Sequence, residues 1–211
     1  MSPNWDLMRR NFVDKYINPA ISDKRVVGAF EKVPRHKFVD REWQSQAYED
    51  KPLPIGFGQT ISQPYTVAFM LQELELKKDD RVLEVGTGSG WNTALISSLV
   101  GEKGKVYSVE VVKELAEKAK EKLKNYKNIT VLNMNAAHGL PKYAPYNKII
   151  LTAAPKELAK EFKEQLVDEG ILLAPVGKYI QKLVKLTKKG NDFIEKEKGN
   201  FIFVPLVDNE Y

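Results

Sequence analysis

Cysteine is absent from this chain of 211 residues, and histidine occurs only at His36 and His138. The lack of cysteine excludes disulfide bonds, thiolate nucleophiles and zinc–sulfur sites, and it permits a reducing compartment. The two histidines lie in different segments without metal-ligand spacing, so we predict no metal site. A G-x-S-x-G motif is missing as well, which leaves a serine hydrolase of that type without support.

Long apolar runs are also missing. No stretch approaches the ~20 apolar residues of a membrane span, and residues 1–10 lack the apolar core of a signal peptide. We therefore expect a cytoplasmic protein without a membrane partner.

Neither sign of charge dominates the chain. Thirty-three basic residues face 28 acidic ones, which gives a net charge of +5. The lysines between residues 118 and 127 are typical of a solvated helix face, so charge alone does not predict a nucleic-acid partner, although RNA stays a possible partner.

For the oligomeric state, we expect a monomer.

The first 78 residues predict helices followed by a shaped loop. Apolar stripes at helical spacing occur at residues 12–17 and 26–30. Residues 52–64 are rich in proline and glycine, which predicts a loop, and Pro64 suits the first turn of a further helix.

From Asp79 onward, short apolar runs alternate with amphipathic stretches. Strands are predicted at residues 81–85, 105–110, 129–132, 148–152 and 171–174. The intervening helices pass through residues 94–99, 115–123 and 158–166. This alternation predicts an α/β fold with a mostly parallel, doubly wound sheet.

Residues 183–187 and 201–204 read as an added antiparallel strand pair around Gly190-Asn191. We expect one domain over residues 1–211. It would contain N-terminal helices with the loop (1–78), a ligand-binding core (79–177) and C-terminal strands (178–211).

The strongest motif is Glu84-Val-Gly86-Thr-Gly88-Ser-Gly90, between a predicted strand and a predicted helix. Glycines there let the backbone approach a ligand, and the helix start supplies free N–H groups. Glu110 ends the next strand and can accept hydrogen bonds from ribose hydroxyls. A dinucleotide fingerprint requires glycine where Trp91 stands. The spacing therefore favours a phosphate-free cation carrying a ribose, such as S-adenosylmethionine.

With this motif, the sequence resembles the protein-L-isoaspartate O-methyltransferases from about Val26 to Val207. The resemblance implies a Rossmann-like class I methyltransferase fold and S-adenosylmethionine as cofactor. It further implies methylation of isoaspartyl carboxylates in damaged proteins and peptides, after which the ester collapses to a succinimide. The matching segments are Val33-Pro-Arg-His-Lys-Phe-Val39, Ala47-Tyr48, Leu53-Pro-Ile-Gly-Phe-Gly-Gln-Thr-Ile-Ser-Gln-Pro-Tyr65, Ala144-Pro-Tyr146, Leu151-Thr-Ala-Ala-Pro155, Ala174-Pro-Val-Gly177 and Phe203-Val-Pro-Leu-Val207.

The resemblance also implies residue roles. Ser62 and Thr60 would be catalytic. Substrate would be bound by Ile61, Val204, Pro205, Leu206 and Val207. Cofactor would be bound by Glu84, Gly86, Thr87, Gly88, Gly90, Glu110, Asn135 and Ala136.

The chemistry agrees with these roles. A carboxylate is ionised at neutral pH and needs no general base to attack a methylsulfonium. Ser62 can orient it by donating a hydrogen bond, whereas the alternative for Ser62 is a cap on the helix at Pro64.

The family pattern is broken after the third strand, where Met134-Asn135-Ala136 replaces Gly-Asp-Gly, and at Asn147, where the family has aspartate. Asn135 keeps an acceptor oxygen for the adenine amino group, but the methyl of Ala136 would clash if this residue needs positive φ. A degenerate member that binds without turnover is therefore one alternative. A nucleic-acid methyltransferase is the other, although Thr152-Ala-Ala-Pro155 stands where exocyclic-amine methylation uses Asn/Asp-Pro-Pro-aromatic.

Overall fold

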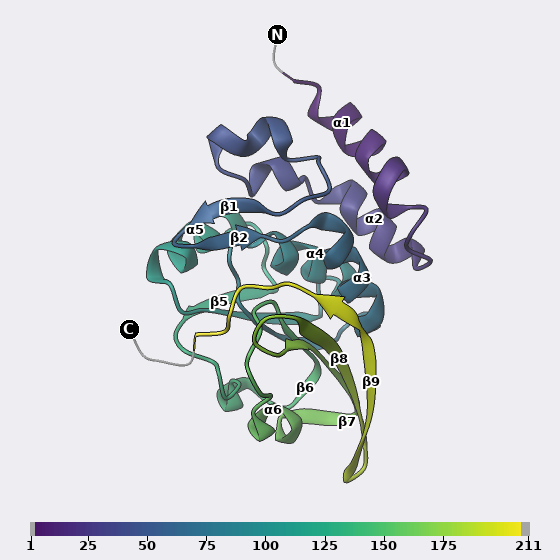
Figure 1. The fold of residues 1–211 in the computed structure, drawn as a ribbon, viewed down its shortest axis with the longest axis vertical. Coiled ribbons are helices and arrows are strands. Elements are labelled where there is room, and N and C mark those ends of the chain that lie inside the picture. Colours follow the sequence, from purple (N-terminus) through teal and green to yellow (C-terminus); the bar gives the residue numbers. More distant parts are fainter. Residues whose placement is uncertain (1–2, 208–211) are drawn as a thin grey trace.

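A seven-stranded sheet in the order β5-β4-β3-β6-β7-β8-β9 forms the centre of the computed structural model, which describes residues 3–207 (Figure 1). β3 to β7 are parallel, and β8 and β9 extend one edge antiparallel. The order reverses beside β3, which creates the switch point where such sheets bind ligands. The strands are β3 (Arg81–Val85), β4 (Lys105–Glu110), β5 (Ile129–Asn133), β6 (Tyr146–Leu151), β7 (Leu166–Val176), β8 (Gln181–Lys189) and β9 (Asp192–Phe201).

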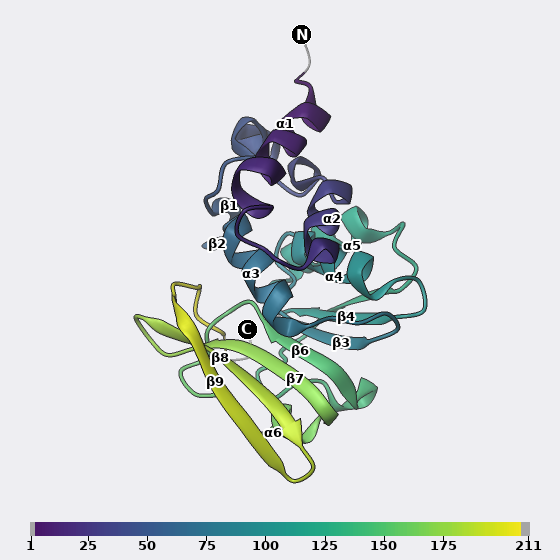
Figure 2. The same cartoon turned by 90° about the vertical axis from the view of Figure 1, so that its right-hand side faces the viewer.

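The central strands are mostly apolar because both faces of the sheet are covered, with buried polar exceptions such as Glu84 in β3 and Lys148 in β6. In β3, Val82 packs into the core on one face, and the next residue, Leu83, packs with Phe162 on the other. Figure 2 shows α3, α4 and α5 on the first face and α6 on the second. The predicted doubly wound sheet is thereby confirmed. These helices are α3 (Pro64–Leu74), α4 (Trp91–Val100), α5 (Lys113–Leu123) and α6 (Lys160–Glu164).

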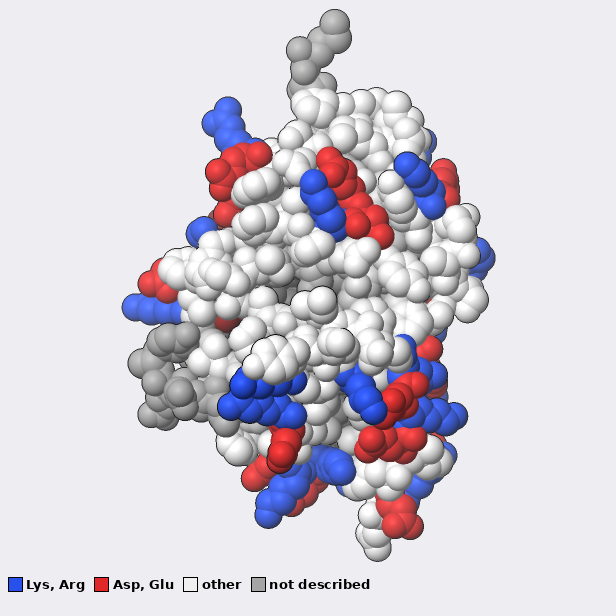
Figure 3. Space-filling view, in the orientation of Figure 1, with Lys and Arg blue, Asp and Glu red and all other residues white. Residues whose placement is uncertain are grey.

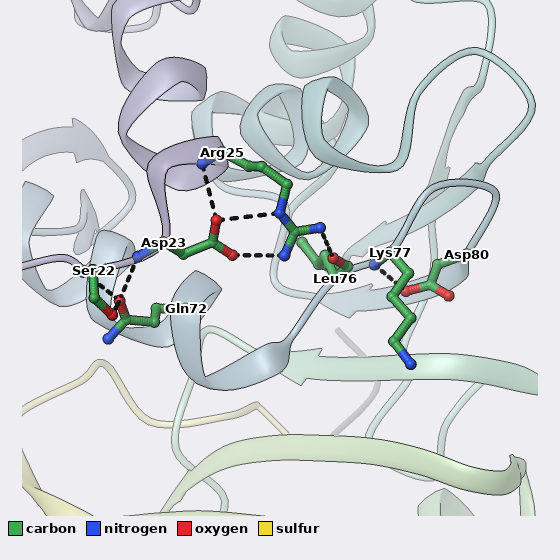
Figure 4. A network of polar contacts seen from close by, with 7 residues as sticks. All are labelled: Ser22, Asp23, Arg25, Gln72, Leu76, Lys77 and Asp80. Atoms are coloured by element: carbon green, nitrogen blue, oxygen red, sulfur yellow. Dashed lines mark hydrogen bonds and ion pairs between the residues drawn. The ribbon is translucent and has the colours of Figure 1, made fainter.

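The N-terminal helices dock on α3 through a polar network (Figure 4). α1 (Trp5–Phe12) continues as a π-helical turn (Val13–Ile17), and α2 (Lys24–Lys32) follows. Asp23 caps α2 and pairs with Arg25, whose guanidinium donates to the carbonyl of Leu76 at 2.8 Å. The side-chain oxygen of Gln72 in α3 accepts three hydrogen bonds from Ser22 and Asp23.

The loop predicted over residues 52–64 contains a small hairpin, β1 (Leu53–Gly56) with β2 (Gln59–Ile61). Two short 3-10 helices, Arg35–Lys37 and Arg41–Gln46, precede it. α3 begins at Pro64, as predicted.

Two predicted elements were wrong. The second strand of the C-terminal pair is β9 (Asp192–Phe201), not residues 201–204. β9 is a solvent-exposed edge strand rich in lysine and glutamate, so it carries no apolar run that sequence reasoning could detect. The helix predicted through residues 158–166 is reduced to α6, because Leu166 already starts β7.

A buried lysine lies at the centre of the sheet. Lys148 in β6 is 4% exposed, and burial lowers the pKa of its amine to about 8. The acidic groups Asp80 and Glu75 face it and oppose this decrease, whereas Lys77 and Lys185 add to it. Protonated Lys148 is therefore a cost to the folded state.

We expect the free energy of unfolding to rise by on the order of 2 kcal/mol between about pH 7 and pH 10, because the unfolded chain there binds the extra proton at position 148. Lys148→Met should lack this rise. The measurement is denaturant unfolding at both pH values, with Lys120→Met on the exposed face of α5 as control. The same rise in Lys148→Met as in the unchanged protein would contradict the assignment.

Candidate active site

A cavity that is partly open to solvent lies at the carboxyl ends of β3, β4 and β6. The hairpin β1–β2 and the segment after β9 complete its wall. Every residue predicted for the site lines this cavity except Glu84 and Gly90. Residues distant in the sequence are thus brought to one place.

The glycine loop after β3 forms the cavity floor. Gly86 has φ +100°, and a Cβ there would clash with the hydroxyl of Thr152, which donates to the Gly86 carbonyl at 2.6 Å. Gly90 is also left-handed, but it starts α4 and leaves room for Leu123 of α5. Gly90 therefore serves helix packing and does not line the cavity.

Glu110 stands at the end of β4 with its carboxylate in the cavity wall. One oxygen accepts from the Gly88 N–H at 2.8 Å and the other from the Val112 N–H at 3.0 Å. Among the described residues that line the cavity, Glu110 is the only ionisable side chain. A wall without lysine or arginine suits a cation bearing ribose hydroxyls, and it does not suit the pyrophosphate of a dinucleotide.

Glu84 does not line the cavity, so the geometry does not agree with the prediction that it contacts the cofactor directly. The side chain is fully buried between β3 and α4, where it accepts hydrogen bonds from Asn92, Thr93 and Ser108. Burial raises the pKa of Glu84 to about 7. Ser108 also bonds Thr87 at 2.6 Å, so Glu84 supports residues that do line the cavity.

The departure from the family pattern at Asn135 and Ala136 is accommodated. Ala136 is buried and is not among the described residues with positive φ, so the anticipated clash does not occur. The side-chain oxygen of Asn135 accepts from the Ala137 N–H at 2.8 Å. Both Asn135 and Ala136 line the cavity.

The hairpin supplies the opposite wall through Thr60, Ile61 and Ser62. The residue before α3 is Gln63, and the carboxylate of Asp50 accepts from the Tyr65 N–H at 2.8 Å. Ser62 is therefore not the helix cap. Its hydroxyl makes no hydrogen bond within residues 3–207 and is available to a ligand.

Arg35 holds this wall in place, and sequence reasoning missed it. It is 1% exposed, and it donates to the carbonyls of Ala47, Lys51 and Ser62 at 2.8, 3.0 and 3.2 Å. Its guanidinium also stacks 5.2 Å from the ring of Trp91 at the start of α4. Burial lowers the pKa of Arg35 to about 10, so it stays charged at neutral pH. The only signal was its place between apolar Val33-Pro34 and Phe38-Val39.

The segment after β9 closes the cavity with Val204, Pro205, Leu206 and Val207. Ala154 donates to the Val204 carbonyl and accepts from the Leu206 N–H, both at 2.8 Å. The amide of Gln181 bonds both main-chain groups of Phe203, at 2.7 and 3.3 Å. The described residues contain no cluster of three metal-ligating side chains.

Two solved structures superimpose closely on this chain, and both are described as isoaspartate or beta-aspartate methyltransferases. A protein-L-isoaspartate O-methyltransferase structure superimposes with a TM-score of 0.87 at 28% identity, covering 96% of this chain and 67% of that one. A Plasmodium falciparum protein described as a beta-aspartate methyltransferase, solved with S-adenosyl-L-homocysteine, gives 0.84 at 25% identity over 99% and 100% of the two chains. The fold and the cavity define the class as a methyltransferase that uses S-adenosylmethionine.

The sequence comparisons then identify the family. The model of the protein-L-isoaspartate(D-aspartate) O-methyltransferases matches residues 8–211, and the chain belongs to this family. A protein-L-isoaspartate O-methyltransferase of Dictyoglomus thermophilum is 42% identical over 208 residues, which cover 97% of this chain and 93% of that protein. One from Methanosarcina mazei is 47% identical over 190 residues, covering 89% and 78%.

Glu110→Gln should weaken S-adenosylmethionine more than S-adenosylhomocysteine, because only the former carries a sulfonium charge. We expect the Kd of S-adenosylmethionine to rise about tenfold, the order of one charge interaction. Isothermal titration with both ligands measures this. Glu114→Gln, an exposed residue in the first turn of α5, is the matched control. An equal loss for both ligands would contradict the electrostatic argument.

Proposed function

We propose that the protein transfers the methyl group of S-adenosylmethionine to the carboxylate of L-isoaspartyl residues in damaged proteins and peptides, which starts repair through a succinimide. One observation carries this proposal. A single cavity is lined by the glycine loop and Glu110 on one side, and by Thr60, Ser62 and the segment after β9 on the other. A methyl donor and a peptide acceptor would therefore meet in it.

The described lining agrees with this reaction because its one ionisable side chain is Glu110, whose two carboxylate oxygens accept from the Gly88 and Val112 N–H groups, and the reaction needs no general base. S-adenosylmethionine supplies an electrophilic methyl group. The carboxylate oxygen forms a bond to the methyl carbon as the sulfur–carbon bond breaks, which leaves a methyl ester and S-adenosylhomocysteine. An ionised acceptor has no proton to remove, so the protein needs to orient it. Ser62 and Thr60 line the cavity, and their hydroxyls would donate hydrogen bonds to the acceptor.

The segment at residues 204–207 is suited to hold the acceptor main chain. The Val204 carbonyl and the Leu206 N–H are already hydrogen-bonded to the main chain of Ala154. Successive residues of an extended chain direct these groups to opposite edges, which leaves the Pro205 carbonyl and the main chain of Val207 for a peptide. Ile61, 3% exposed, supplies apolar contact at the base of this site.

All three predicted segments contribute to the cavity, which supports a single functional domain. The first segment supplies the hairpin wall, the second the cavity floor, and the third the closing residues 203–207. No helix in residues 3–207 is long and apolar enough to cross a membrane. Cytoplasmic localisation and a monomeric state stay predictions.

Neither alternative gains support. A nucleic-acid methyltransferase would favour cationic side chains around its acceptor, and the described lining has none. A non-catalytic member was suggested by Asn135 and Ala136, which fit without backbone strain.

The decisive experiment offers one peptide in L-isoaspartyl and normal aspartyl forms, with labelled S-adenosylmethionine. We expect base-labile label on the isoaspartyl form alone. Bulk RNA is the third acceptor. No transfer to either peptide, by folded protein that binds S-adenosylhomocysteine, would favour the non-catalytic alternative, and label on RNA would favour the nucleic-acid enzyme.

Ser62→Ala should lower kcat about tenfold to a hundredfold, which is the order of one hydrogen bond to a charged group. Affinity for S-adenosylhomocysteine should stay unchanged. Initial rates with the isoaspartyl peptide and isothermal titration measure the two quantities. Ser98→Ala, exposed on α4, is the control. Full activity of Ser62→Ala would remove this residue from catalysis.

A further inference from the structure

Seven large apolar side chains are exposed among the described residues. Five of them lie on the cavity wall or close in the chain to residues that contact it. Met134 lines the cavity, Phe57 lies in the turn of the hairpin that lines it, and Ile202 precedes the lining residue Phe203. Tyr179 and Ile180 precede Gln181, whose amide bonds Phe203. In Figure 3 the surface around the central hollow carries few charged side chains. Exposed apolar groups that cluster at a site usually mark an interaction surface. The five are Phe57, Met134, Tyr179, Ile180 and Ile202, and the other two are Leu7 on α1 and Ile194 on β9.

Three of these side chains form one edge, which we call the apolar rim together with Phe203. Tyr179 and Ile180 lie in the turn between β7 and β8 and are 78% and 69% exposed, and Ile202 after β9 is 85% exposed. Gln181 pairs with Phe201 in antiparallel register. Continuing that register places Ile180 opposite Ile202.

The apolar rim is continuous with the proposed acceptor site. The main chain of Phe203 is fixed by the amide of Gln181, and Phe203 itself lines the cavity. The residues that follow it are those suited to hold the acceptor main chain. A peptide with its isoaspartyl residue in the cavity would therefore lay its neighbouring residues across the rim.

The charged residues next to the rim are two lysines that flank it in the chain. The amine of Lys178 lies 5.1 Å from the centre of the Tyr179 ring, and Lys182 is paired with Glu197 at 2.8 Å. Neither lysine belongs to the pair that the continued register makes of Ile180 and Ile202. The chemistry that matches this surface is an apolar side chain.

We propose that the apolar rim binds apolar side chains next to the isoaspartyl residue, so that the protein selects damage sites in apolar segments. Such segments are buried in intact proteins and become accessible when damage opens the fold. This inference rests on the proposed function and adds a substrate preference to it.

The test compares two isoaspartyl peptides of equal length, one with leucine and one with glycine on both sides of the damaged residue. We expect a KM about tenfold lower for the leucine peptide, the order for ~50 Å² of apolar surface leaving water. The double variant Ile180→Ser with Ile202→Ser should lose this preference while keeping kcat on the glycine peptide and affinity for S-adenosylhomocysteine. Ile194→Ser, near the far end of the same hairpin, should keep the preference.

Equal KM values for the two peptides with the unchanged protein, or a preference that survives in the double variant, would overturn the inference while leaving the proposed function intact. A dimer in sedimentation equilibrium that the double variant dissociates would assign the rim to a second copy of the chain and would also overturn it. Methylation of neither peptide would reject the proposed function, and the inference with it.

Discussion

The buried guanidinium of Arg35 is the interaction on which the acceptor half of the cavity depends. The residues it bonds, Ala47, Lys51 and Ser62, lie outside the regular strands and helices. An arginine out of water is costly unless its donors are used, and here main-chain carbonyls accept from its two terminal nitrogens, while its Nε is buried without a hydrogen bond among the described residues. Its stacking on Trp91 ties this wall to the helix that follows the glycine loop. One cation therefore sets the position of the acceptor wall relative to the cofactor floor.

The two acidic residues near the glycine loop, Glu110 and Glu84, differ in burial and in what they contact. Glu110 reaches the cavity and holds the glycine loop through the Gly88 N–H. Glu84 is completely buried, and burial raises the pKa of its carboxyl group to about 7. Its three hydrogen-bond donors come from α4 and β4, so it joins these elements under the site. A single negative side chain is left to face a cationic cofactor.

Sequence patterns predicted the parallel core well because buried strands are short runs made mostly of apolar residues. β3 and β4 begin and end at the predicted residues. The bounds of β9 were not predicted because an exposed edge strand needs no apolar face that a sequence pattern would reveal. The structural role of Arg35 was not predicted because the sequence alone does not show that a charged side chain is buried. The motif placed Glu84 at the cofactor, but whether a strand residue points at a ligand or under it depends on packing with the next helix.

The charged edge of β9 has a consequence for a protein whose proposed substrates are damaged chains. Such chains expose strands that can pair with any open sheet edge and aggregate. The alternating lysines and glutamates of β9 oppose that pairing along the outer edge of the sheet. The segment at residues 204–207, which we propose holds the acceptor main chain, contains Pro205, which offers no N–H and limits how far a foreign backbone can pair there. The charged edge of β9 would thereby discourage a bound damaged chain from joining the sheet.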